Sequence, residues 1–269
     1  VWGPVESNDV KYRDLTLLAT SLTVADNDVA GIEVGSDNLG VGENGSSVVG
    51  KFRLTSEPRE SVTLELSGGV GEVSFSSSTL TFNASNWSNY QFVTLTGVDD
   101  DIDDGLQTET ILIQASSLDL AYQGVSQTFT VQNADNDIAG INLGELSSTL
   151  VSEDGGASEL SLTLSSRPLH DVTVSFALDS TRGALSNATQ VFTPAQWDES
   201  RTLRFNSVND ALDNGNVSVT ISASTTSLDP LYDGISVAER TLTVIDDDAS
   251  GLVFTSTTDF EVIDGNAQQ

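Results

Sequence analysis

The sequence predicts an all-β protein built from tandem antiparallel β-sandwich modules of immunoglobulin-like size, with about seven strands each, arranged end to end. Short runs such as residues 92–96 and 160–164 alternate apolar residues with Thr or Ser, and this period of two buries one face of a strand. Gly and Asn/Asp/Ser clusters separate the runs, and no helical period of 3.6 residues persists. An acidic motif also recurs at the spacing of one small domain.

This acidic motif divides the chain into modules. It is DNDVAGI at residues 26–32, DNDIAGI at 135–141 and DDDASGL at 246–252, so successive copies begin 109 and 111 residues apart. A segment of this length suits one β domain. We therefore expect two whole modules, 29–137 and 138–248, between the tail of a preceding module (1–28) and the start of a following one (249–269).

Apolar and Thr-rich runs locate the strands of the first module. Val and Thr are β-branched and suit a pleated surface. Trp87 and Trp197, each five residues after a Phe, are predicted to anchor the two cores. The aromatic residues Trp2, Phe75 and Tyr90 are candidates for a surface patch that only one module carries. The strands are expected at residues 48–55, 61–67, 79–82, 91–98, 109–115 and 126–132.

Composition excludes several classes of function. Ten basic residues against 40 acidic ones give a net charge of −30, whereas nucleic-acid binding requires basic stripes, so nucleic acid is excluded as a partner. No apolar run approaches 18 residues, so direct membrane insertion is not expected. Cysteine is absent. An extracellular module without disulfides needs another source of stability, and a metal is the usual substitute.

The aspartates are clustered in a way that indicates cation binding. Twelve of the 26 aspartates occupy 15 positions, at residues 99–104 and at the three junctions; an acidic, well-solvated surface would not need such clusters. Two carboxylates ~5 Å apart repel by roughly 3 kcal/mol at an effective dielectric of ~20. Calcium accepts six to eight oxygen ligands in loose geometry, which suits these loops better than magnesium or zinc. Residues 99–110 do not form an EF-hand, because they lack its Gly and its final Glu.

Three features together resemble the Calx-β family, the calcium-binding sandwich of sodium–calcium exchangers and of many bacterial surface proteins. They are VGENG at 41–45 with VSEDG at 151–155, VDDDI at 98–102, and the Asp-rich triplet followed by Ala-Gly-Ile. Gln107 stands at a further acidic position of the family, which implies one weaker or missing site. In the first module, the resemblance implies calcium ligands at Glu43, Glu72, Asp99, Asp100, the backbone carbonyl of Ile102, Asp104, Asp135 and Asp137.

The second module departs from this pattern. Asn209 and Asn214 stand in place of Asp99 and Asp104, and Arg182 replaces Glu72. Fewer carboxylates and one added guanidinium should lower calcium affinity, so we expect one ion there or none. The candidate ligands that remain are Glu153, Asp210, Asp213, Asp246, Asp247 and Asp248, and the first junction offers Asp26 and Asp28.

No active site is predicted. The only histidine, His170, follows Pro168 in a turn, and the serines lack a neighbouring base. Acidic loops would allow a carboxylate pair for glycoside cleavage, but their recurrence at each junction favours scaffolding. We expect a calcium-rigidified structural repeat, or extender, of a large secreted or cell-surface bacterial adhesin-type protein, with calcium and neighbouring modules as partners. The alternative is a module that binds a surface glycan or protein, or that senses calcium.

Overall fold

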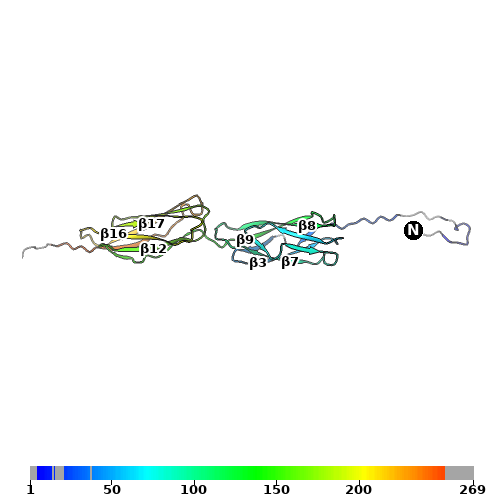
Figure 1. Cartoon of the computed structure of the whole chain (residues 1–269), viewed down its shortest axis with the longest axis horizontal. Coiled ribbons are helices and arrows are strands. Elements are labelled where there is room, and N and C mark those ends of the chain that lie inside the picture. The colour runs from blue at the N-terminus through cyan, green and yellow to red at the C-terminus, as the bar shows by residue number, and fades with distance from the viewer. Residues whose placement is uncertain (1–4, 14, 16–20, 37, 252–269) are drawn as a thin grey trace, which may run out of the picture. The chain divides into compact units, whose positions relative to one another are not determined.

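The computed structural model describes residues 5–13, 15, 21–36 and 38–251. Within these residues the chain forms strands and turns without a helix, and two β-sandwiches follow one another along the sequence (Figure 1). The predicted all-β sandwich fold is confirmed. The predicted start of a following module falls mostly on residues 252–269, outside the described part, as does Trp2. No helix of the described residues is long and apolar enough to cross a membrane.

The first sandwich contains nine strands in the described residues, two more than predicted. One sheet has the order β1-β3-β7-β5 and the other has the order β2-β9-β8-β4-β6. All six predicted strands are present, with ends within two residues of the expected ones, whereas three shorter strands were not predicted. The strands are β1 (Ile32–Val34), β2 (Asn38–Gly42), β3 (Ser47–Leu54), β4 (Val62–Ser67), β5 (Val73–Phe75), β6 (Thr79–Phe82), β7 (Gln91–Gly97), β8 (Gln107–Ser117) and β9 (Ser126–Ala134).

The second sandwich repeats this topology, with sheet orders β10-β12-β16-β14 and β11-β18-β17-β13-β15. Short β11 pairs with β18 in parallel, a departure from the expected all-antiparallel pairing. The strands are β10 (Ile141–Leu143), β11 (Leu150–Ser152), β12 (Ala157–Leu164), β13 (Val172–Leu178), β14 (Gly183–Ser186), β15 (Thr189–Phe192), β16 (Arg201–Ser207), β17 (Val217–Ser227) and β18 (Arg240–Ile245).

Alternation along the strands builds each core. In β7, Val93 and Leu95 are fully buried while Phe92 faces water, as the period of two requires. Trp87 and Trp197 pack against the first and second core, as predicted. Phe75, considered above as a surface aromatic, also packs against the first core, because residues 73 and 75 of β5 share the inward face.

In each sandwich, a buried tyrosine in the loop before the last strand bonds to the backbone of a distant serine. The Tyr122 hydroxyl donates to the Ser56 carbonyl over 2.6 Å and accepts the Ser56 N–H over 3.1 Å. Tyr232 makes the same two bonds with Ser166, at 2.6 and 3.2 Å. The repeated hydrogen bonds show that the two sandwiches share internal detail as well as strand order.

Candidate metal centre

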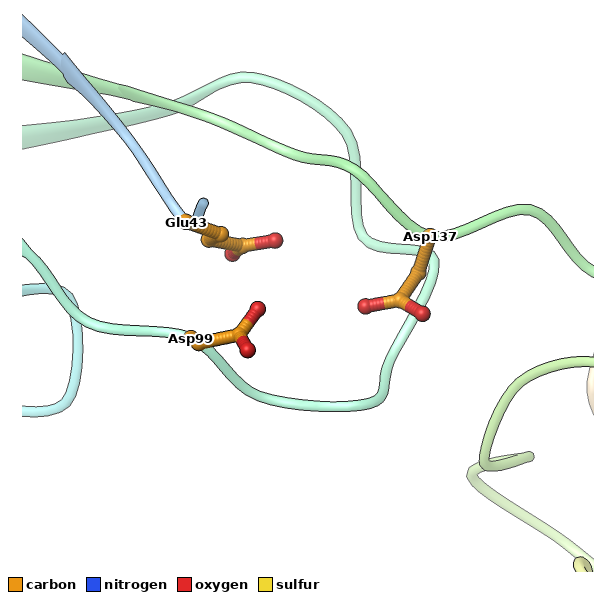
Figure 2. Close-up of side chains that lie close together, drawn as sticks. All are labelled: Glu43, Asp99 and Asp137. Carbon is orange, nitrogen blue, oxygen red and sulfur yellow. The ribbon is translucent and has the colours of Figure 1, made fainter. Parts of the chain in front are cut away.

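Three segments of the first sandwich bring carboxylates together. Glu43 lies in the turn between β2 and β3, Asp99 lies in the loop after β7, and Asp137 follows β9. Figure 2 shows their carboxylates pointing toward one another, and each residue offers an oxygen within 4.8 Å of the others. The loop at 99–104 and Asp137 of the junction therefore lie together in the structure.

Backbone contacts fix this arrangement. The Glu43 N–H donates to the Ala134 carbonyl over 3.1 Å, which ties the β2–β3 turn to the end of β9. Strand β7 ends beside that turn at Gly97, where an added Cβ would lie 2.3 Å from the Gly42 carbonyl oxygen. Only glycine permits so close an approach. The turn that carries Glu43 and the strand that leads to Asp99 are thus held against each other.

Asn136 is a member of this site that sequence reasoning missed. Its backbone N–H donates to Glu43 Oε2 over 3.2 Å, and its side-chain amide donates to Asp99 Oδ1 over 3.0 Å. The sequence did contain a signal for this role: Asn136 stands between two aspartates, and its amide is the only side-chain hydrogen-bond donor of that triplet. Asn136 thus donates hydrogen bonds to two of the three carboxylates and helps to orient them.

Burial makes the site electrostatically expensive without a cation. Glu43 is only 2% exposed, and desolvation raises its pKa to about 7, with Asp135 and Asp100 adding repulsion and the Asn136 N–H opposing the rise. Burial also raises the pKa of Asp137, with further contributions from Asp135 and Asp101. Asp137 Oδ2 is buried and has no hydrogen-bond donor. A buried, donorless carboxylate oxygen beside other carboxylates is the environment that a bound cation would satisfy.

A second acidic group in the first sandwich consists of Glu72, Asp100 and Asp104, which also offer oxygens within 4.8 Å of one another. The Ile102 N–H donates to Asp100 Oδ1 over 2.6 Å, so Asp100 also shapes the loop. The Ile102 carbonyl as a metal ligand stays a prediction. Gln107, at the position where the family has an acidic residue, donates its amide to the Asp104 carbonyl over 2.7 Å.

The side chain of Asp135 binds backbone N–H groups of the loop and belongs to neither acidic group. Its carboxylate accepts the Gly105 N–H and the Asp137 N–H, both over 2.6 Å. The same local bond recurs at the first junction, where the Asp28 N–H donates to Asp26 Oδ1 over 3.0 Å. Among the described residues, Asp26, Asp28 and Asp135 do not belong to a group of three possible metal ligands. Their predicted role as ligands is therefore not visible in the geometry.

The second sandwich has a corresponding group, Glu153, Asp210 and Asp248, again with oxygens within 4.8 Å. Here Arg182 contributes a cation from the chain itself: its Nη1 lies 3.0 Å from Glu153 Oε1 and also contacts Asp210. Burial and the neighbouring Asp246 and Asp247 raise the pKa of Asp248, whose Oδ2 is buried without a donor. The group keeps the shape of the first site but already holds a positive charge.

The remaining predicted ligands of the second sandwich bind backbone groups or lie outside the group. Asp246 accepts the N–H groups of Asn214 and Asp248 over 2.7 and 3.0 Å, and backbone hydrogen bonds led by that of Asp248 lower its pKa. Asp213 accepts the Ser250 hydroxyl over 2.7 Å, which lowers the Asp213 pKa. Asp247 is exposed and is not a member of the group.

Comparison with known proteins adds little to this picture. No protein-family model and no curated protein matches the chain. Among solved structures, the D00-D0 domain of Intimin is 12% identical, with 81% of this chain and 100% of that chain covered and a TM-score of 0.30. CBD12 from CALX1.2 is 15% identical, with 80% and 99% covered and a TM-score of 0.32. The calcium binding domain CBD12 of CALX1.1 is 16% identical, with 72% and 80% covered and a TM-score of 0.31. At these TM-scores the similarities support no assignment of family or function.

Proposed function

We propose that this chain is a calcium-binding structural repeat, an extender, of a large secreted or cell-surface protein of the adhesin type. The observation that carries the proposal is the group of Glu43, Asp99 and Asp137, in which Glu43 is almost fully buried and Asp137 has a buried oxygen without a donor. The order of acidic motifs, which resembles the Calx-β family, supports it. The proposal assigns no enzymatic activity to the chain.

The donor set favours calcium over other metals. The side chains of the three groups in the described residues offer only carboxylate oxygens, and calcium takes oxygen ligands in irregular arrangements. Zinc prefers nitrogen and sulfur ligands, but the chain has no cysteine and its one histidine lies in a turn. A divalent cation bound to Glu43, Asp99 and Asp137 would offset their mutual repulsion and satisfy the buried oxygen of Asp137.

The place of the site in the chain supports a structural role. Asp137 is followed directly by Ile138, whose carbonyl accepts the Ser165 hydroxyl over 2.7 Å, and the Ser165 N–H donates to the Gly140 carbonyl over 3.0 Å. The chain therefore passes from a candidate ligand to an anchored residue of the second sandwich without a linker. A metal held by Asp137 would restrict the backbone torsions at this junction, and such a restriction would stiffen an array of modules.

Calorimetric titration of the chain with calcium tests the binding. The double variant Asp99→Asn/Asp137→Asn should lose at least one binding event, whereas Asp171→Asn/Asp198→Asn, which removes two aspartates outside the acidic groups, should not. Magnesium should bind more weakly, because it demands a regular octahedron. If the two double variants bind calcium alike, the site is assigned wrongly.

Small-angle scattering tests the stiffening separately. With calcium, the distribution of distances within the chain should become narrower than with chelator, while circular dichroism of the strands stays nearly unchanged. The variant Asp135→Asn/Asp137→Asn should not respond to calcium in scattering. A profile that ignores calcium, or sandwiches that unfold in chelator, would rule out the extender mechanism.

A further inference from the structure

The outer face of the sheet β1-β3-β7-β5 carries a group of side chains that the proposed function does not use. Lys51 pairs with Phe92 across β3 and β7, and Val49 pairs with Thr94. Because the flanking Phe52 and Val93 point into the core, these residues face water; Phe92 is 59% and Val49 47% exposed. We call the following residues the outer patch: Glu33, Val49, Lys51, Arg53, Tyr90 and Phe92.

Part of the outer patch is held rigid by its own contacts. The Tyr90 hydroxyl donates to Glu33, and Arg53 Nε donates to the same carboxylate over 2.9 Å. The Arg53 guanidinium also lies over the Tyr90 ring, 4.7 Å from its centroid. These three side chains are therefore ordered before any ligand arrives, which lowers the entropic cost of binding at this face.

Gly35 brings the stem of Lys51 close to this rigid part. Its N–H donates to the Lys51 carbonyl over 2.8 Å. An added Cβ on Gly35 would lie 3.0 Å from Lys51 Cβ and 3.5 Å from Tyr90 Cε1. The missing side chain thus leaves room for the stem of Lys51 and the ring of Tyr90 at this position, and Lys51 faces Phe92 across the strand pair.

The fold does not require this surface, because the second sandwich lacks it. The strand pairing identifies the equivalent positions in the second sandwich. These positions hold polar or ion-paired residues and no aromatic ring. The outer patch is therefore a property of the first sandwich alone. Its pairs Glu33–Arg53, Val49–Thr94 and Lys51–Phe92 correspond to Asn142–Thr163, Glu159–Arg204 and Ser161–Thr202.

The charge of the outer patch indicates the chemistry of its ligand. Glu33 and Arg53 neutralise each other, whereas Lys51 takes part in none of the ion pairs of the described residues. Lys51 is one of two lysines in a chain of net charge −30, so an exposed, unpaired lysine beside Phe92 provides a local cation for an anionic ligand. Phe92 and Val49 offer too little apolar area for a stable protein interface, which needs about 800 Å² per partner.

We propose that the outer patch binds an acidic glycan, with a sugar ring against Phe92 and its carboxylate on Lys51. A pyranose ring combines an apolar C–H face with hydroxyl and carboxylate groups, which matches an exposed aromatic ring beside a cation. Aromatic side chains with a polar rim are also the usual centres of binding energy. Since the cation is exposed, added salt should weaken the binding.

The test uses the full chain and a defined probe, a galacturonate oligomer, with the neutral galactose oligomer of equal length as comparison. Binding is measured by calorimetry and by NMR shifts, in chelator, so that the result does not depend on the proposed calcium site. The variants Phe92→Thr and Lys51→Ser install the residues that the second sandwich has at these positions. Arg204→Gln, on the equivalent face of the second sandwich, is the matched control.

Phe92→Thr should weaken galacturonate binding at least tenfold. Lys51→Ser should remove the preference for galacturonate over the neutral oligomer, and Arg204→Gln should change nothing. Unchanged melting of each variant shows that these surface substitutions leave the fold intact. The proposal is overturned if the chain does not bind galacturonate at millimolar concentration, or if Phe92→Thr binds it as the parent chain does. Equal binding of a poly-glutamate peptide, with the same sensitivity to both variants, would also overturn the assignment to a glycan.

Discussion

The acidic groups of the two sandwiches differ in the source of their positive charge. Glu43 and Glu153 are both almost fully buried, 2% and 1% exposed. Glu43 is surrounded by carboxylates and has a pKa raised to about 7, whereas Glu153 contacts the guanidinium of Arg182. Arg182 lies in the turn before β14, and Glu72 lies in the corresponding turn before β5. The same turn position thus holds a guanidinium that contacts the acidic group in the second sandwich, and in the first a carboxylate that joins the neighbouring group of Asp100 and Asp104.

Removing the internal cation should produce the largest effect. Arg182→Gln leaves the buried Glu153 without its partner, and breaking a buried ion pair from one side costs about 3–5 kcal/mol. In chelator, hydrogen exchange should report a corresponding loss of protection in the second sandwich and none in the first. As a control, Arg204→Gln breaks the pair with Glu159, where both side chains are 47% exposed, and should cost less than about 1 kcal/mol. Equal effects of the two variants would mean that Arg182 is not an internal cation.

Calcium should stabilise the first sandwich selectively. At free calcium about 100-fold above the dissociation constant, one site contributes about 2.7 kcal/mol to the free energy of unfolding. Hydrogen exchange with and without chelator should show this gain in peptides of the first sandwich only. Asp99→Asn should reduce the gain there. Equal protection of both sandwiches by calcium would contradict the role assigned to Arg182.

Without metal, the free energy of unfolding should depend on pH differently in the two sandwiches. This effect should be smaller than the effect of calcium. The pKa of Glu43 is raised in the folded state from 4.5 to about 7, so the folded state retains a proton that the unfolded state loses. This contribution to stability is complete below pH 4.5, declines as the pH rises toward 7, and is absent above it. Calcium competes with this proton, so its affinity should increase over the same range. Glu43→Gln should flatten the stability profile of the first sandwich; a profile unaffected by this variant would contradict the assignment.

The tyrosine–serine hydrogen bonds that both sandwiches share should contribute equally to their stabilities, so the expected difference between the sandwiches is smallest here. Tyr122→Phe and Tyr232→Phe each remove the same pair of hydrogen bonds to a serine backbone. Each variant should cost about 1–2 kcal/mol, equally in the two sandwiches and regardless of calcium. Denaturant unfolding with peptide-resolved hydrogen exchange, with and without calcium, measures the loss of stability in each sandwich. A calcium-dependent loss of stability in either sandwich would mean that the tyrosine–serine hydrogen bonds and the acidic group of that sandwich are coupled.

Much of the fold could be predicted because the long strands carry a strong pattern. Runs such as Gln91–Gly97 repeat the alternation often enough to fix their ends to within two residues. The strands Ile32–Val34 and Val73–Phe75 are three residues long, too short for a period to appear, and only pairing with longer neighbours makes them strands. The same alternation places Phe92 on the outer face; the sequence indicated Tyr90 as a surface aromatic residue, but the exposed Phe92 beside Lys51 was overlooked.

The site was less predictable than the fold. The sequence identified the acidic segments, but it could not show which carboxylate of each segment faces the others. The carboxylate of Asp135, whose role as a metal ligand stays a prediction, accepts backbone N–H groups, while Asp137 two residues later faces Glu43 and Asp99. The direction of each side chain depends on the path of the loop, which tertiary hydrogen bonds determine.

The parallel pairing of β11 with β18 has a mechanical consequence. Strand β18 is the last of its sandwich, and the register joins residues 150–152 to residues 243–245. A pull on the two ends of the sandwich draws the start of β11 and the end of β18 in opposite directions along their common axis. The hydrogen bonds between them are then loaded in shear, all at once, instead of being unzipped one by one. A pull that separates the two ends would therefore have to break these bonds together, in addition to the pairing of β10 with β12.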